Sequence, residues 1–152
     1  MNVASMMSSP VHTVRKDASV AEVVRTMKDR RVSVVPVVDE GDKVVGVITV
    51  SDLVPQVRNA PASNIQLLSL RNEYIDFASI GSAYEKVSRL PASEVMKEPV
   101  ATIRPETEIG TAAKLMAEHE IGSLPVVSDD GVLVGIVTRT DLARLAIDQG
   151  RA

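Results

Sequence analysis

The stretch GVITVSDL at residues 46–53 occurs a second time, with few changes, as GIVTRTDL at residues 135–142. In both copies Gly, Thr, Asp and Leu keep the same spacing, and a threonine at the end of an apolar run is followed three residues later by an aspartate. Such a group at a strand-to-helix junction is typical of an N-cap. Capping requires only one of these side chains, so it does not explain why the pair is kept twice.

The similarity extends far beyond this octapeptide. Met7 aligns with Met96, and the offset of 89 residues then holds without a gap until Leu53 and Leu142. Fourteen of the 47 aligned positions are identical, and most other apolar positions exchange Val, Ile, Leu and Ala. An internal repeat of this kind indicates two copies of one structural unit.

Each copy predicts the same order of elements. After a short opening strand, apolar residues recur at i, i+3, i+4 and i+7, which predicts an amphipathic helix. Asp17 or Ser19 is the candidate N-cap of the first helix, and Thr107 is that of the second. Two Val/Ile-rich runs around an Asp/Gly-rich turn then predict a hairpin. A final helix follows Asp52 or Asp141.

One such unit is too small to bury both faces of its sheet. We therefore expect an α/β fold in which two β-α-β-β-α units pack around a pseudo-twofold axis. The expected boundaries are 1–57 for the first unit, 58–90 for a helical insert and 91–152 for the second unit. The insert holds the three aromatic residues of the chain. They either pack on a unit or a dimer partner, or cap a bound base.

Composition excludes several classes of protein. A net charge of −3 and a pI near 5.4 argue against a dedicated nucleic-acid binder. The absence of cysteine excludes disulfides, thiolate metal sites and thiol catalysis. The opening residues lack the apolar stretch of a signal peptide, and no apolar run could span a bilayer. We expect a soluble, cytoplasmic protein.

No catalytic constellation is present in the sequence. His12 and His119 occupy non-equivalent repeat positions, and no cluster has metal-ligand spacing. Phosphate-binding and dinucleotide-binding glycine motifs are absent. The acidic stretches DEGD at 39–42 and SDDG at 128–131 fit hairpin turns better than cation loops. We therefore expect that the protein is not an enzyme and has no catalytic cofactor or metal.

Three motifs recur in the same order in both copies: MSSPVHTV with MKEPVATI, RRVSVVPVVD with HEIGSLPVVS, and GVITVSDL with GIVTRTDL. With these motifs the chain resembles a stand-alone tandem pair of CBS (cystathionine-beta-synthase-type) domains, the arrangement called a Bateman module. The resemblance implies two clefts between the units, an adenosine ligand (AMP, ADP, ATP or S-adenosylmethionine) and a homodimer.

The repeated aspartate has chemistry suited to such a ligand. A carboxylate accepts hydrogen bonds from both vicinal hydroxyls of a ribose, and Thr or Ser hydroxyls donate to phosphate oxygens. The resemblance further implies that each cleft takes its Thr/Asp motif from one copy and its base-contacting residues from the other. The first cleft would combine Thr138, Arg139, Thr140 and Asp141 with Val11, His12, Val32 and Ser33. The second cleft would combine Thr49, Ser51 and Asp52 with Val100, Ala101, Ile121 and Gly122.

The two clefts are predicted to differ. His12, Ser33 and the nearby Arg139 give the first cleft more donors than Ala101 and Gly122 give the second. The first cleft is therefore the expected site of a phosphorylated ligand, unless His12 and Arg139 point to solvent.

Three functions compete at this stage. The first is a regulatory sensor that binds an adenosine nucleotide and modulates a partner protein not identified by the sequence. The second is a ligand-free interaction or scaffold module that acts through dimerisation. The third, a small enzyme or nucleic-acid binder, is disfavoured by the missing site and the acidic balance.

Overall fold

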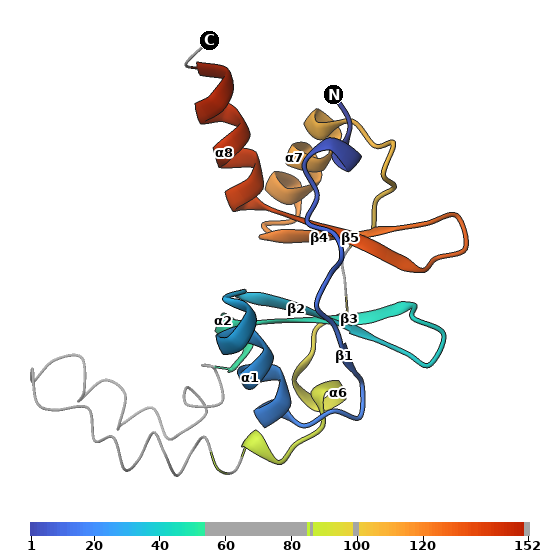
Figure 1. The fold of residues 1–152 in the computed structure, drawn as a ribbon, viewed down its shortest axis with the longest axis vertical. Helices are drawn as coiled ribbons and strands as arrows, with labels where there is room; N and C mark the ends of the chain where they lie inside the picture. Colours follow the sequence, from blue (N-terminus) through green and yellow to red (C-terminus); the bar gives the residue numbers. More distant parts are fainter. Residues whose placement is uncertain (54–84, 86, 99–100, 151–152) are drawn as a thin grey trace, which may run out of the picture.

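The repeat folds into two equivalent α/β units, one above the other in Figure 1. The computed structural model describes residues 1–53, 85, 87–98 and 101–150. The predicted helical insert, 58–90, falls almost wholly outside these residues, as do its three aromatic side chains.

The first sheet has the strand order β1-β2-β3, with β1 parallel to β2 and β2 antiparallel to β3. A single helix, α1, links β1 to β2, and the short α2 follows β3. This order confirms the predicted strand, helix, hairpin and helix. The bounds are β1 Val14–Arg15, α1 Val20–Arg30, β2 Val34–Val38, β3 Val44–Thr49 and α2 Val50–Leu53.

The second unit repeats this pattern. Its hairpin, β4-β5, has the same register as β2-β3, displaced by the repeat offset. Ile103 forms a parallel bridge to Val126, where the first unit pairs Val14 with Val37. The bounds are α7 Ile109–Glu118, β4 Ser123–Val127, β5 Leu133–Thr138 and α8 Arg139–Gly150.

The N-caps of the two amphipathic helices differ. Ser19 caps α1, as predicted, because its hydroxyl accepts a hydrogen bond of 3.2 Å from the Glu22 amide. The prediction that Thr107 caps α7 is wrong. Glu108 occupies the N-cap and makes no side-chain cap bond. The Thr107 hydroxyl instead accepts from the amide of Arg104 in the preceding turn, so it is not available to the helix.

The two units exchange their leading segments. The 3-10 helix η1 (Val3–Ser5) lies beside α7, and Val3 is fully buried in the core of the second unit. In return, α6 (Ala92–Val95) lies beside α1, and Ala92 is fully buried in the core of the first unit. The leading segment of each repeat therefore completes the core of the other unit.

Reciprocal contacts establish the pseudo-twofold relation. Ser8 pairs with Ile136 on β5, and the equivalent residue Lys97 pairs with Val47 on β3. Between the hairpin turns, Lys43 bridges to Val132, which is its own equivalent in the other unit. A contact that maps onto itself in this way lies on the symmetry axis. Within the described residues, no helix combines the length and apolar character needed to cross a membrane.

Candidate nucleotide-binding clefts

Two cavities lie between the units and are related by the pseudo-twofold axis. The first cleft has a volume of about 210 Å³ and the second of about 390 Å³. Each has one wall from the junction after β3 or β5 and the other from the opposite unit, as predicted.

The Thr/Asp pair has the same local geometry in both clefts. In the first, the amide and the hydroxyl of Thr138 donate to Oδ2 of Asp141 at 2.8 and 2.9 Å. In the second, Thr49 makes the same two bonds to Oδ2 of Asp52 at 2.8 and 3.0 Å. The threonine therefore fixes one carboxylate oxygen and leaves the other oxygen available. In both clefts the threonine hydroxyl donates its proton to the aspartate. The expectation that this hydroxyl donates to a phosphate is therefore wrong.

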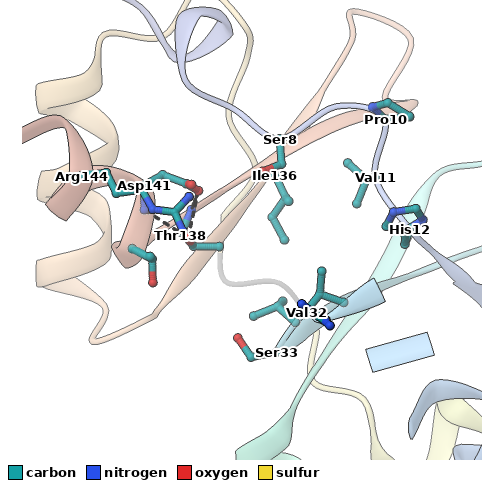
Figure 2. Close-up of a pocket in the computed structure, with 13 residues that line it drawn as sticks. Ser8, Pro10, Val11, His12, Val32, Ser33, Ile136, Thr138, Asp141 and Arg144 are labelled. Atoms are coloured by element: carbon teal, nitrogen blue, oxygen red, sulfur yellow. Dashed lines mark hydrogen bonds between the residues drawn. The ribbon is translucent and has the colours of Figure 1, made fainter. Parts of the chain in front are cut away.

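The first cleft brings its predicted residues together. Figure 2 shows Thr138 and Asp141 on one side of the cavity, with Val32 and Ser33 on the other. All the predicted residues except Arg139 line the cavity: Val11, His12, Val32, Ser33, Thr138, Thr140 and Asp141.

The position predicted for Arg139 is wrong. Its backbone amide donates to Gly122 O, and its Nε donates to Ile121 O at 3.1 Å, so the side chain follows the segment that lines the second cleft. In its place, Arg144 lines the first cleft, one helical turn after Thr140. Helical spacing could have revealed this residue, because positions i and i+4 share a face.

The second cleft contains Thr49, Asp52, Ala101, Ile121 and Gly122 from the predicted set. Val100 and the side chain of Ser51 lie outside the described part of the chain.

Charged residues that the sequence reasoning missed separate the two clefts. Arg31 lines the first cleft, and its repeat equivalent Glu120 lines the second. Both residues have a φ of 53°, so each follows its helix in a left-handed conformation and carries its side chain to the same place. Comparing charges at repeat-equivalent positions would have found this inversion.

The resulting electrostatics differ in sign. Among the described residues, the first cleft is lined by Arg31 and Arg144 with Asp141 as its one carboxylate, and His12 also lines it. The part of the second cleft that the structure describes is lined by two cations, Lys97 and Arg139, and by three carboxylates, Asp52, Glu98 and Glu120. Within the described ranges, no three His, Asp or Glu side chains lie where they could share a metal ion.

The sequence profile of the CBS domain family matches residues 3–58 and 92–148. The chain therefore belongs to the CBS domain family, and its two units form a tandem CBS pair, or Bateman module. A relative of similar length is the uncharacterized protein MJ1426 of Methanocaldococcus jannaschii, which is 30% identical over 97% of this chain and 92% of its own.

Solved structures share the fold along nearly the whole chain. The CBS domain of a CBS domain containing membrane protein from Sphaerobacter thermophilus is 36% identical, with a TM-score of 0.75 over 95% of this chain and 87% of that one. CBSX2 in complex with AMP is 25% identical, with a TM-score of 0.71 over 98% of both chains. The CBS pair of MJ0100, in complex with 5-methylthioadenosine and S-adenosyl-L-methionine, is also 25% identical, with a TM-score of 0.72 over 98% of both chains.

Proposed function

We propose that this CBS pair is a regulatory module that binds an adenosine nucleotide, with AMP as its simplest ligand and the first cleft as its stronger site. The main support is the carboxylate of Asp141, of which only one oxygen accepts hydrogen bonds from the residues that the structure describes. Oδ2 is held by Thr138, while Oδ1 accepts no hydrogen bond from any described residue. A ribose hydroxyl fits that free oxygen, because it can donate to a carboxylate.

The opposite wall supplies apolar surface for a base. Val11 and Val32 line it, and both side chains are half-buried. Arg31, next to Val32 in the sequence, and Arg144, on the same helix as Asp141, are exposed and offer guanidinium groups at the cavity. A guanidinium pairs well with phosphate because it donates two parallel hydrogen bonds. Aspartate for ribose, valines for the base and arginines for phosphate together suit a nucleoside phosphate.

Volume and charge favour different clefts. The second cavity is larger, but its three carboxylates repel a phosphate. For an anionic ligand we expect charge to matter more than volume. The free-energy cost of leaving a phosphate without a counter-charge exceeds the gain from closer apolar contacts. The solved complexes of CBSX2 with AMP and of MJ0100 with S-adenosyl-L-methionine support an adenosine ligand for this fold.

The test compares Asp141→Ala with its repeat equivalent Asp52→Ala in calorimetric titrations with AMP. Loss of a hydrogen bond to a charged group costs about 1.5–3 kcal/mol, so we expect Asp141→Ala to weaken AMP binding roughly 10- to 100-fold. Asp52→Ala should leave the stronger site unchanged. Equal binding by both variants and the parent would contradict the assignment of the ribose contact.

A wider ligand screen separates sensing from scaffolding. A ligand that binds only the folded protein raises its melting temperature, so ADP, ATP and S-adenosylmethionine should be compared with AMP. The absence of any shift would favour the ligand-free interaction module. In the proposed mechanism the ligand fixes the relative orientation of the two units, and a partner protein recognises that orientation. That partner, the homodimer and the cytoplasmic location stay predictions.

A further inference from the structure

Among the described residues, the second cleft contains an ion pair that has no counterpart in the first cleft. Lys97 Nζ lies 2.9 Å from Oδ1 of Asp52, the same oxygen that would receive a ribose hydroxyl. The Asp52 side chain is only 3% exposed, whereas that of Lys97 is 77% exposed. Despite the short distance, the contact lacks hydrogen-bond alignment, and Oδ1 accepts no hydrogen bond within the described part of the chain.

The backbone holds Lys97 at this place. The Lys97 amide donates to Val47 O at 3.0 Å, and the Val47 amide donates to Lys97 O at 2.8 Å. The start of the side chain is therefore fixed beside Val47, two residues before Thr49 on β3, while most of the side chain is exposed and its ammonium group reaches Asp52. Such an ammonium group can move between Asp52 and water without disturbing the fold.

The first cleft provides an internal reference. Its equivalent residue, Ser8, makes the same pair of backbone bonds, to Ile136 at 2.9 and 3.2 Å. Serine is too short and carries no charge, so Asp141 has no counter-ion at this position. The two ribose-binding carboxylates thus differ by one side chain on an otherwise equivalent backbone.

We propose that Lys97 competes with ribose for Asp52 and thereby makes the second cleft the weaker adenosine site; this inference rests on the proposed function. A buried carboxylate is costly without a counter-charge. A ribose hydroxyl must therefore displace the ammonium group before it can bind Oδ1. With Lys97 engaged, Glu98 and Glu120 dominate the remaining charge of the cavity and further disfavour a phosphate.

The test uses adenosine, which has the ribose diol but no phosphate for Lys97 to bind. Asp141→Ala is introduced first, so that only the second cleft is titrated. Lys97→Ser, which copies the first cleft, should then lower the adenosine Kd roughly fivefold, the effect of removing a partly exposed ion pair. Lys97→Arg retains the charge and should keep the weak binding of the parent.

The opposite substitution, made in the first cleft, gives an independent measurement. In an Asp52→Ala background, Ser8→Lys should place an ammonium group beside Asp141 and raise the adenosine Kd of the first cleft, again roughly fivefold. A purely structural role of residue 97 would not predict this effect. Thermal melting of every variant checks that it is folded, and the Ser8→Lys result stands if Lys97→Ser does not fold.

An unchanged or higher Kd in Lys97→Ser would overturn the inference, and a higher Kd would identify Lys97 as a ligand-binding residue. AMP titration of the first cleft, with Asp141 intact, tests the proposed function separately. If AMP binds there but Lys97→Ser gains nothing, only the competition fails. If AMP does not bind but Lys97→Ser gains adenosine binding, the first-cleft proposal fails and the competition stands. No binding by any variant overturns both.

Discussion

Asp52 and Asp141 show how one carboxylate can serve two purposes. Thr49 and Thr138 each make two hydrogen bonds to a single oxygen of the aspartate, which ties the end of the strand to the helix that follows. The threonine does not use the second oxygen, which in Asp141 is available to a ligand and in Asp52 lies beside Lys97 Nζ. Capping and ligand binding, which compete as explanations of the sequence, are therefore compatible. The threonine is explained as the group that orients the aspartate.

Asp39 is another aspartate whose carboxylate holds the local backbone, here in the turn of the first hairpin. Its Oδ1 accepts hydrogen bonds from the amides of Gly41 and Lys43 at 2.9 and 3.0 Å. The Lys43 bond is the main cause that holds the pKa of Asp39 below its usual range; desolvation opposes it, and the Gly41 bond and the charges of Lys43 and Lys16 add to it. The equivalent residue, Ser128, accepts from the Val132 amide without a titratable group.

We predict that the first hairpin loses stability in acid when Asp39 is protonated. Because the folded pKa of Asp39 is lowered, its stabilisation is complete above the ordinary aspartate pKa and is lost as the pH falls through the lowered value. Carboxyl and Gly41 amide chemical shifts should follow one titration. Asp39→Ser should reduce the acid dependence of the unfolding midpoint, and an unchanged dependence would refute the assignment.

Among the elements, each hairpin packs closely against the leading segment of the other repeat. Gly46 on β3 lies against Met96, and Gly135 on β5 lies against Met7. A Cβ atom at Gly46 would lie 2.7 Å from Met96 Cγ, whereas one at Gly135 would lie 3.0 Å from Met7 Cγ. Both glycines thus leave room for a methionine from the leading segment of the other repeat.

We expect Gly46→Ala to lower the free energy of unfolding by about 1–3 kcal/mol through overpacking. Gly135→Ala should cost less, because the methionine there has more room to move. Gly110→Ala in α7 is the control, since its added methyl group meets nothing within 4 Å, and it should be neutral or stabilising by up to about 1 kcal/mol. Urea denaturation measures all three. Equal costs at Gly46 and Gly110 would contradict the packing argument.

Elements with local signals could be predicted from the sequence, and those that depend on long-range contacts could not. Helical spacing and turn residues gave α1, α7 and both hairpins, because periodicity is a local property. The Thr107 cap was wrong because the adjacent Glu108 occupies the position equivalent to Ser19. Arg139 was placed in the wrong cleft because the sequence does not reveal that its side chain bonds to Ile121 O.

At the scale of the whole molecule, the repeat predicted two units and an approximate twofold axis, and the resemblance to CBS pairs implied clefts with walls from opposite copies. It did not predict that η1 and α6 are exchanged. That exchange depends on which core has room for Val3 or Ala92, and both cores are built from similar Val and Ile residues. The inverted charges of Arg31 and Glu120 became informative only once both were placed at a cleft.

The exchange predicts that a change near the start of the chain destabilises the second unit. Val3 is fully buried, so Val3→Ala should cost roughly 2 kcal/mol. Amide exchange should accelerate in β4 and β5 more than in β2 and β3. Val50→Ala, at a side chain that is 49% exposed, is the control and should stay within about 0.5 kcal/mol of the parent. Greater loss of protection in β2 and β3 would refute the exchange.

The exchanged segments also constrain how the chain folds during its synthesis. Residues 1–8 are synthesised before residues 103–137, from which their binding surface is built. The first sheet is complete by residue 49, yet it must wait for α6 to cover it. Domains commonly fold one after another from the N-terminus. Here each core needs a segment from the other repeat, so we expect neither unit to reach its native state before both repeats have been synthesised.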